Sequence, residues 1–324
     1  MTRGNPFRSH SSPRTHKASR WGDRIFLVLT GIGAAGVVAV LVAVGVILYY
    51  GALPIIDRDG LSFLTNRVWN PEFNVYGIVP FAAGTLLTSA IALLISVPLS
   101  IGAALFLTQH APQWLREPIA QVVQMLAAIP SVIFGFWGLI VIVPVMASTV
   151  NPALARYLGW TGAFGGPTDI GTNVLTASVV LAIMTVPTIT ALSKDSIMAV
   201  PRTQTEAAIS LGATDWEVAR KAVLPYARGG IVAGIVLGLG RALGETMAVT
   251  LVIGNANVIP NSFLGPGQTI ASLIANDFFE NFDPLERPAL VYAALVLLVI
   301  TLAVNVGARF LLARFQRGMG EKVE

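Results

Sequence analysis

Six long apolar runs constrain this chain more than any other feature of its sequence. A helix needs roughly 17 to 25 residues to cross about 30 Å of hydrocarbon. Runs long enough to do so occupy residues 25–50, 81–107, 119–146, 174–192, 231–254 and 289–310. They are continuous rather than alternating, which indicates helices and excludes the strands of a membrane barrel. The mean hydropathy of +0.71 and the 12% share of charged residues agree. We therefore expect an all-α membrane protein with six transmembrane helices.

The first run follows a basic segment, as the apolar core of a secretion signal does. Its length of about 25 residues exceeds the 7 to 15 of such a core, which favours a retained helix over a cleaved one. Residues 1–24 are rich in Ser, Pro and basic side chains and predict a disordered tail. Such a tail fixes topology and contacts anionic headgroups.

The distribution of Lys and Arg predicts the orientation. Six precede residue 25, Arg116 follows the second run, five lie within 193–228, and four lie from Arg309 onward, out of 21 in total. The positive-inside rule then places both termini in the cytoplasm and residues 51–77 outside. Because the membrane topology accounts for the net charge of +4, that charge does not indicate nucleic-acid binding.

Several classes of chemistry have no support in the sequence. The chain has no cysteine and only three histidines, none of which are grouped, so we expect no metal site. It also has no phosphate-binding G-x-x-x-x-G-K-[ST] loop, no nucleophile elbow and no HExxH motif. We therefore expect no enzymatic activity and no cofactor in this chain.

Residues 193–228 are too rich in helix signals to be a simple connector. Thr203 with Glu206, and Thr214 with Glu217, both have the spacing of a capping box, and Gly212 lies where the first helix would end. We expect two helices separated by a break at Gly212. On physical grounds this segment is either a docking element for another protein or an amphipathic pair on the membrane surface.

Two charges interrupt the fifth run, in the sequence LGLGRALGETMA at 237–248. A charge at mid-membrane costs roughly 2.5 to 3.5 kcal/mol, so Arg241 and Glu245 should face the protein interior or a watery path. As residues four apart on one helix they would share a face with Gly230, Gly234 and Gly238, where another helix can pack closely. Arg241, Glu245 and the adjacent Thr246 are candidates for a substrate path or gate. The alternative is an ion pair that only stabilises packing.

Two other segments are weaker candidates. Pro130 and Ser131 could line a path, although a proline kink that serves packing is the simpler interpretation. Residues 270–278 have apolar side chains at helical spacing and predict a short helix, which would lie either at the membrane interface or against a partner.

The sequence EAAISLGATDWEVARKAVLP resembles the EAA signature of permease subunits in type I ABC importers. The matching positions are Glu206, Ala207, Ala208, Gly212, Leu224 and Pro225, and the departure is Ala222 where isoleucine is usual. The stretch around Arg241, together with AAIPSVIFGFWGL and GPGQTIASLIANDF, resembles the PstC type of phosphate permease rather than the PstA type.

This resemblance implies a MetI-like permease core of five helices over residues 78–313, preceded by the helix 25–50 and followed by a cytoplasmic tail at 314–324. It implies that 193–228 couples the chain to an ATPase, with ATP and Mg bound by that partner. The implied partners are a PstA-type permease, two PstB-type ATP-binding subunits and an external PstS-type phosphate-binding protein in a bacterial cytoplasmic membrane. Sulfate or molybdate import, and a scaffold that reports phosphate status, remain alternatives.

Overall fold

The computed structural model describes residues 20–279 and 284–320, apart from the side chains of Arg20, Gln113 and residues 311–320. Most of the predicted tail at 1–24 and the last residues of the predicted tail at 314–324 lie outside these ranges. The chain divides into two compact units, one up to Ile47 and one from Leu48 onward, which are described separately.

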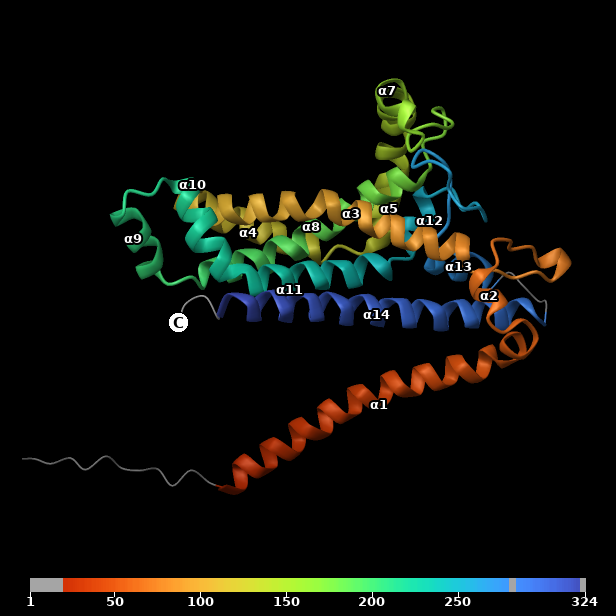
Figure 1. Cartoon of the computed structure of the whole chain (residues 1–324), viewed down its shortest axis with the longest axis horizontal. Coiled ribbons are helices and arrows are strands. Elements are labelled where there is room, and N and C mark those ends of the chain that lie inside the picture. The colour runs from red at the N-terminus through yellow and green to blue at the C-terminus, as the bar shows by residue number, and fades with distance from the viewer. Residues whose placement is uncertain (1–19, 280–283, 321–324) are drawn as a thin grey trace, which may run out of the picture. The chain divides into compact units, whose positions relative to one another are not determined.

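The described residues are helical, with two isolated β-bridges and no named strand. The α-helices are α1 (Arg20–Asp59), α2 (Ser62–Thr65), α3 (Val79–Leu105), α4 (Gln113–Ala127), α5 (Ser131–Trp137), α6 (Val143–Val145), α7 (Asn151–Leu158), α8 (Val174–Met198), α9 (Arg202–Ser210), α10 (Asp215–Val218), α11 (Leu224–Leu243), α12 (Met247–Val252), α13 (Ile270–Asp277) and α14 (Glu286–Gly320) (Figure 1). Short 3-10 or π turns η1 (Pro71–Phe73), η2 (Phe106–His110), η3 (Gly138–Ile142), η4 (Met146–Val150), η5 (Gly159–Thr161) and η6 (Ala219–Val223) adjoin them.

Six of the helical stretches are long and apolar enough to span a membrane, which confirms the predicted number and the all-α class. The first, 39 residues from Trp21 to Asp59, extends past both ends of the predicted run 25–50. Its residues up to Ile47 present exposed apolar side chains on all sides, as expected of a helix that lipid surrounds.

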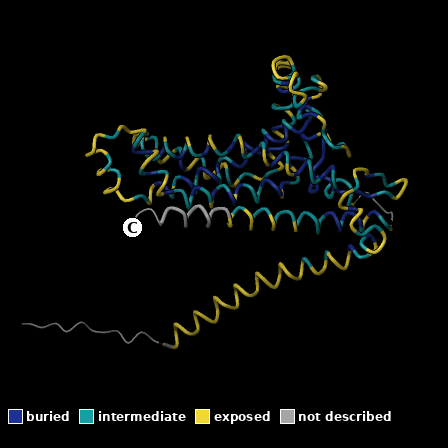
Figure 2. Tube along the Cα trace, viewed as in Figure 1, coloured by how far each residue is buried: buried dark blue, intermediate teal, exposed yellow. Residues whose placement is uncertain are grey.

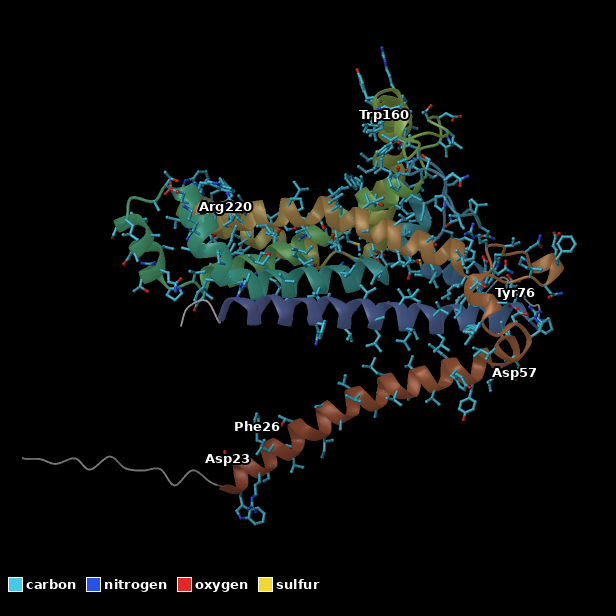
Figure 3. All side chains as sticks on the ribbon, in the orientation of Figure 1. Asp23, Phe26, Asp57, Tyr76, Trp160 and Arg220 are labelled. Carbon is cyan, nitrogen blue, oxygen red and sulfur yellow. The ribbon has the colours of Figure 1, made fainter. Side chains whose placement is uncertain are left out.

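The third span differs from the prediction of 119–146. Helix α4 ends at Ala127, and the spanning stretch runs instead from Ser131 to Thr161, through α5, η3, α6, η4, α7 and η5. The cause is Pro130, which lacks an N–H group and disfavours helical backbone at the residue before it. Its ψ of 137° ends one helix and begins the next. The far end of this stretch carries Trp160, which is 84% exposed and points outward (Figure 3).

The fifth span is also displaced from its predicted range of 231–254. It begins at Asp215, because the π turn η6 continues α10 directly into α11, and it ends at Leu243. Residues 244–246 interrupt the helix before α12 begins at Met247. The predicted continuous helix through Glu245 is therefore wrong.

Helix α8 forms the centre of the second unit. Two thirds of its most apolar window (67%) is buried, more than in any other candidate span of the described residues. Helices α3 and α11 pack along it, and the buried residues concentrate inside this bundle (Figure 2). On α11, a Cβ added at Gly234 would lie 3.1 Å from Leu192 Cβ, and one at Gly238 would lie 2.9 Å from Ile189 Cδ1. The glycine stripe therefore faces α8, as its spacing predicts.

A second core closes one end of this bundle. Ala52 and Ile55 of α1, the segment 63–81, α13 and α14 bury a shared apolar cluster. In it, the Phe63 and Tyr292 rings stack with centroids 4.3 Å apart. The predicted short helix at 270–278 is confirmed as α13. Its predicted position at the membrane interface or against a partner is wrong for Ile270 and Leu273, which are fully buried in this cluster of the chain itself.

Candidate functional site

The break between α11 and α12 positions the charges of the fifth span. Gly244 ends α11 with φ −97° and ψ 2°, and Thr246 precedes α12 with φ −111° and ψ −69°. Arg241 lies in the last turn of α11, whereas Glu245 and Thr246 lie within the break itself. The three candidate residues thus come from a helix end and a loop rather than from one helix face.

Arg241 is half-buried and has one hydrogen bond in the described part of the chain. Its Nη1 donates to Thr188 Oγ1 over a long distance of 3.4 Å. Thr188 lies near the middle of α8 and is itself half-buried, so the guanidinium lies beside the central part of that helix. A guanidinium has five N–H donors, so the bond to Thr188 uses only a minority of the donors of Arg241.

Glu245 is buried, with 9% of its surface exposed. Its Oε1 accepts a hydrogen bond from the backbone N–H of Ala248 at 3.2 Å. That N–H belongs to the first turn of α12, where intrahelical acceptors are lacking. Glu245 therefore caps α12 from the break, an arrangement that also places its negative charge at the favourable end of the helix dipole.

The ion pair between Arg241 and Glu245, which was the alternative to a substrate role, is absent from the described structure. Its ion pairs join Arg58 to Asp59 and Lys221 to Glu217. The prediction assumed that both residues share one helix face, and the break at Gly244 removes that geometry. If Glu245 does not contact substrate, its role is therefore that of a helix cap rather than of an ion-pair partner.

Helix α12 is held by a close contact with α5. A Cβ added at Gly135 would lie 2.7 Å from Ala248 Cα, so only glycine lets the two helices approach this closely. The third-span candidates lie at the start of α5, where Pro130 is exposed and Ser131 is half-buried. They therefore sit one turn from the residue that positions α12, and the described structure shows no hydrogen bond from Ser131 to Arg241 or Glu245.

Sequence reasoning missed two polar residues that pack on the end of α11. One is Thr188 of α8, the hydrogen-bond partner of Arg241. The other is Asn305 of α14, whose side-chain amide lies 3.6 Å from the place a Cβ at Gly240 would take. A single polar residue in an apolar run is a weak signal, and only the packing of α8 and α14 on α11 brings each one to this helix.

The second candidate region is the hairpin of α9 and α10. Gly212 adopts a φ of +83°, which favours glycine, and connects the two helices as predicted. The capping box of Thr214 and Glu217 is confirmed. The one predicted at Thr203 is wrong, because α9 begins at Arg202 behind Pro201 and has no side-chain cap. Pro201 occupies the N-cap position with a ψ of 133°, and it has no side-chain oxygen that could cap α9.

The hairpin presents one face outward and anchors the other. Glu206 and Ala207 are exposed, and Leu211 is 89% exposed. Ala208 packs on a small core built from Ala104, Ile197, Val218, Val223, Ala227 and Ile231. Leu224 joins this core, and Pro225 occupies the first turn of α11. The exposed face thus combines apolar side chains, among them Ile209 and Leu211, with polar ones and the carboxylate of Glu206.

No group of three potential metal-ligating side chains occurs in the described residues. The arrangement offers a half-buried arginine with spare donors beside the hydroxyl of Thr188, and an exposed hairpin at the end of the bundle. These features suit a conduit for an anion and a docking element for another protein.

Comparison with known proteins identifies this architecture. Residues 96–321 match the family of binding-protein-dependent transport system inner membrane components. The chain is 44% identical to the phosphate transport system permease protein PstC of Mesorhizobium japonicum, over 92% of both chains. It is 45% identical to that of Pasteurella multocida, over 93% of this chain and 94% of the relative.

The fold agrees with that of a solved importer. A chain from the crystal structure of a bacterial alginate ABC transporter, in complex with an alginate-bound periplasmic protein, superposes with a TM-score of 0.56 at 18% sequence identity. The match covers 91% of this chain and 98% of the other, and it confirms the predicted permease fold. The chain therefore belongs to the binding-protein-dependent transport system inner membrane components, within the group of PstC phosphate permeases.

Proposed function

We propose that this chain is the membrane-spanning subunit of an ATP-driven importer and conducts inorganic phosphate past Arg241 into the cytoplasm. Its similarity to phosphate permeases over more than nine tenths of its length supports the substrate. Both termini lie in the cytoplasm, in agreement with the excess of basic residues on that side.

The observation that carries the proposal is the interruption of a spanning helix beside a half-buried arginine with free donors. Backbone breaks within a membrane span are tolerated where they line a cavity or are buried in protein. The planar guanidinium of Arg241 binds two oxygens of a tetrahedral oxyanion at once. Its single long bond to Thr188 costs little to give up when phosphate arrives.

Glu245 contributes a preference for phosphate over sulfate. Phosphate near neutral pH carries at least one O–H group, whereas sulfate carries none. One carboxylate oxygen of Glu245 accepts the Ala248 N–H, and the other accepts the phosphate proton. This chemistry disfavours sulfate or molybdate, which would bring a fully charged oxygen to a carboxylate.

Transport needs other chains. The exposed face of α9 docks an ATP-binding subunit, and Glu206, Ala207 and Gly212 form the contact, while Ala208 anchors the helix from behind. ATP and Mg bind to that subunit. A second permease completes the conduit, and an external binding protein delivers phosphate.

Uptake of labelled phosphate and sulfate by cells that lack or express the chain, with all partners present, tests this function. We expect deletion to abolish the high-affinity phosphate uptake and to leave sulfate uptake unchanged. Loss of sulfate or molybdate uptake instead would support another oxyanion. Unchanged phosphate uptake with altered phosphate-dependent gene expression would support a signalling scaffold and contradict transport.

A further inference from the structure

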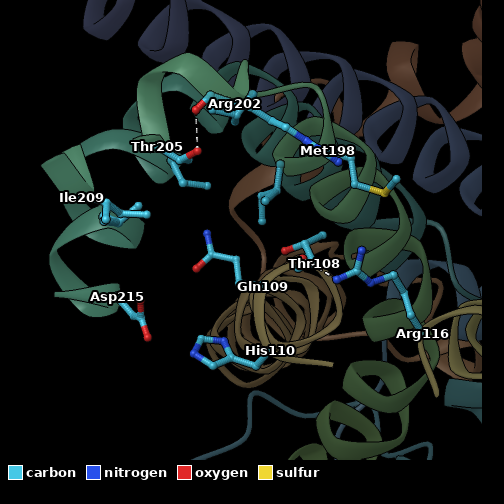
Figure 4. A pocket seen from close by; sticks show the side chains of 13 residues that line it. Thr108, Gln109, His110, Arg116, Met198, Arg202, Thr205, Ile209 and Asp215 are labelled. Atoms are coloured by element: carbon cyan, nitrogen blue, oxygen red, sulfur yellow. Dashed lines mark hydrogen bonds between the residues drawn. The ribbon is translucent and has the colours of Figure 1, made fainter. Parts of the chain in front are cut away.

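A polar cavity lies behind the α9–α10 hairpin, and neither Arg241 nor Glu245 lines it. It has a volume of about 420 Å³, within the range typical of small-molecule sites. Its walls come from the α3–α4 turn (residues 106–116, from η2 into the first turn of α4), the end of α8 and the inner face of the hairpin (Figure 4). The side chains that face it from these elements include Thr108, Gln109, His110, Arg116, Arg202 and Asp215.

Arg116 gives the cavity an incompletely satisfied positive charge. Its Nη2 donates to the backbone oxygen of Thr108 at 2.9 Å. Its Nε is buried and has no hydrogen-bond partner in the described structure. Removing a guanidinium from water without enough acceptors is costly, and an anion recovers that cost through charge-assisted hydrogen bonds.

The other groups of the cavity complement an anion of modest size. Arg202 adds a second positive charge from the first turn of α9, and Asp215 is the only carboxylate among the lining residues. The amide of Gln109 offers a neutral donor, whereas the hydroxyls of Thr108 and Thr205 donate to backbone oxygens of Ala104 and Arg202. Figure 4 shows Gln109 and Arg116 on the side of the α3–α4 turn. The net charge of the lining is positive, so the electrostatics favour an oxyanion over a cation or an apolar ligand.

We propose that this cavity binds a phosphate group, either as free inorganic phosphate or as the headgroup of an anionic phospholipid, and that the ligand ties the hairpin to the α3–α4 turn. Arg116 and Arg202 belong to the two sides of the cavity, so one anion held by both joins them. Its position at the cytoplasmic face rests on the proposed function. The consequence is a restraint on the hairpin that responds to the anion on the inner side of the membrane.

Hydrogen–deuterium exchange of the complete importer tests the proposal locally. The importer is placed in nanodiscs of pure phosphatidylcholine, with inorganic phosphate or with chloride at equal ionic strength, and then in nanodiscs that also contain phosphatidylglycerol. Peptides from 106–116 and 202–215 report on the cavity, and a peptide from 240–250 reports separately on the transport path.

We expect the cavity peptides to exchange more slowly when the anion is bound. At a concentration four times the dissociation constant, protection should be about fivefold. Protection by phosphate in pure phosphatidylcholine identifies the free ion, whereas protection only with phosphatidylglycerol identifies the lipid headgroup. No protection under any of these conditions overturns the proposal.

Two substitutions and a matched control connect the protection to the cavity. Arg116→Gln and Arg202→Gln should each remove most of it, and Arg202→Gln serves if the first variant fails to assemble. Arg220→Gln removes the same charge from an exposed η6 residue outside the cavity and should retain the full effect. Protection that persists in both cavity variants contradicts the site.

An Arg241→Gln variant separates anion binding in the cavity from phosphate transport, because its cavity peptides should respond to the anion as those of the wild type do.

Discussion

The helix break at 244–246 and the α9–α10 hairpin place charge in opposite ways. In the hairpin, Glu217 is exposed to solvent yet engaged, since it bonds both the Thr214 cap and Lys221, the latter at 2.8 Å. In the break, Arg241 is half-buried and Glu245 is buried. These two charges bond different elements, because Arg241 donates to Thr188 of α8 and Glu245 accepts from Ala248 at the start of α12. Glu217 stabilises a local structure, whereas Arg241 and Glu245 keep hydrogen-bonding capacity that the described fold does not use.

The difference indicates where each region meets its partner. The exposed Leu211 and Ala207 of the hairpin suit docking to another protein by shape. A half-buried arginine with free donors suits a ligand that arrives and leaves.

Reversing the charge of Glu206 should break the docking surface. In Glu206→Lys we expect roughly hundredfold weaker binding of the ATP-binding subunit, because like charges at an interface cost several kcal/mol. Pull-down with the purified subunit measures this. Glu117→Lys, the same change at an exposed position on α4, is the control. Equal binding of both variants would refute the assignment of α9 as the docking helix.

Filling the contact between α5 and α12 should destabilise the break. Gly135→Leu places atoms where Ala248 Cα lies and should lower the stability of the complex by about 2 kcal/mol through overpacking. Thermal unfolding of the detergent-purified complex measures the loss. Gly102→Leu is the matched control, since a Cβ there has nothing within 4 Å. A similar loss of stability in both variants would mean that the close contact between Gly135 and α12 is not the cause.

Two substitutions at Glu245 separate its capping role from a substrate role. Glu245→Ala removes the acceptor for the Ala248 N–H and should cost about 1.5 kcal/mol of stability. Glu245→Gln retains an acceptor oxygen and should keep most of that stability while phosphate uptake falls. Full phosphate uptake in Glu245→Gln would mean that Glu245 only caps α12 and does not contact phosphate.

Substitutions at the two predicted capping boxes should change helix stability by small and unequal amounts. Thr214→Ala should cost about 1 kcal/mol because Thr214 caps α10, whereas Thr203→Ala should cost nearly nothing because it caps no helix. Hydrogen exchange of residues 214–220 and 202–210 measures local opening in each. Equal effects of the two substitutions would contradict the observed helix starts.

Local sequence signals predicted the spans and the hairpin, and they failed where two signals compete. Apolar length identified the six spans, and positive φ at Gly212 follows directly from its place between two helical patterns. Pro130 and Gly244 both interrupt runs that hydropathy alone joins together. At Gly244, continuation of α11 competes with a new helix start that Glu245 caps. The periodicity of apolar residues is the same in both cases, so it does not predict which of the two structures forms.

The surroundings of the candidate site depend on packing between distant segments. Arg241 and Glu245 stand out in the sequence because charge is rare in an apolar run. Thr188 and Asn305 do not, because hydroxyl and amide groups occur along most spans. They become neighbours of α11 only through contacts of α8 and α14, which the glycine stripe permits.

Coupled uptake and ATP hydrolysis in Arg241→Gln most directly tests the central claim that the break beside Arg241 conducts phosphate. Proteoliposomes with the complete importer and its external binding protein would be loaded with ATP, and labelled phosphate and released ADP would be measured together. We predict that uptake is lost while the complex stays assembled and hydrolyses ATP. Wild-type uptake in Arg241→Gln would contradict a path through this residue.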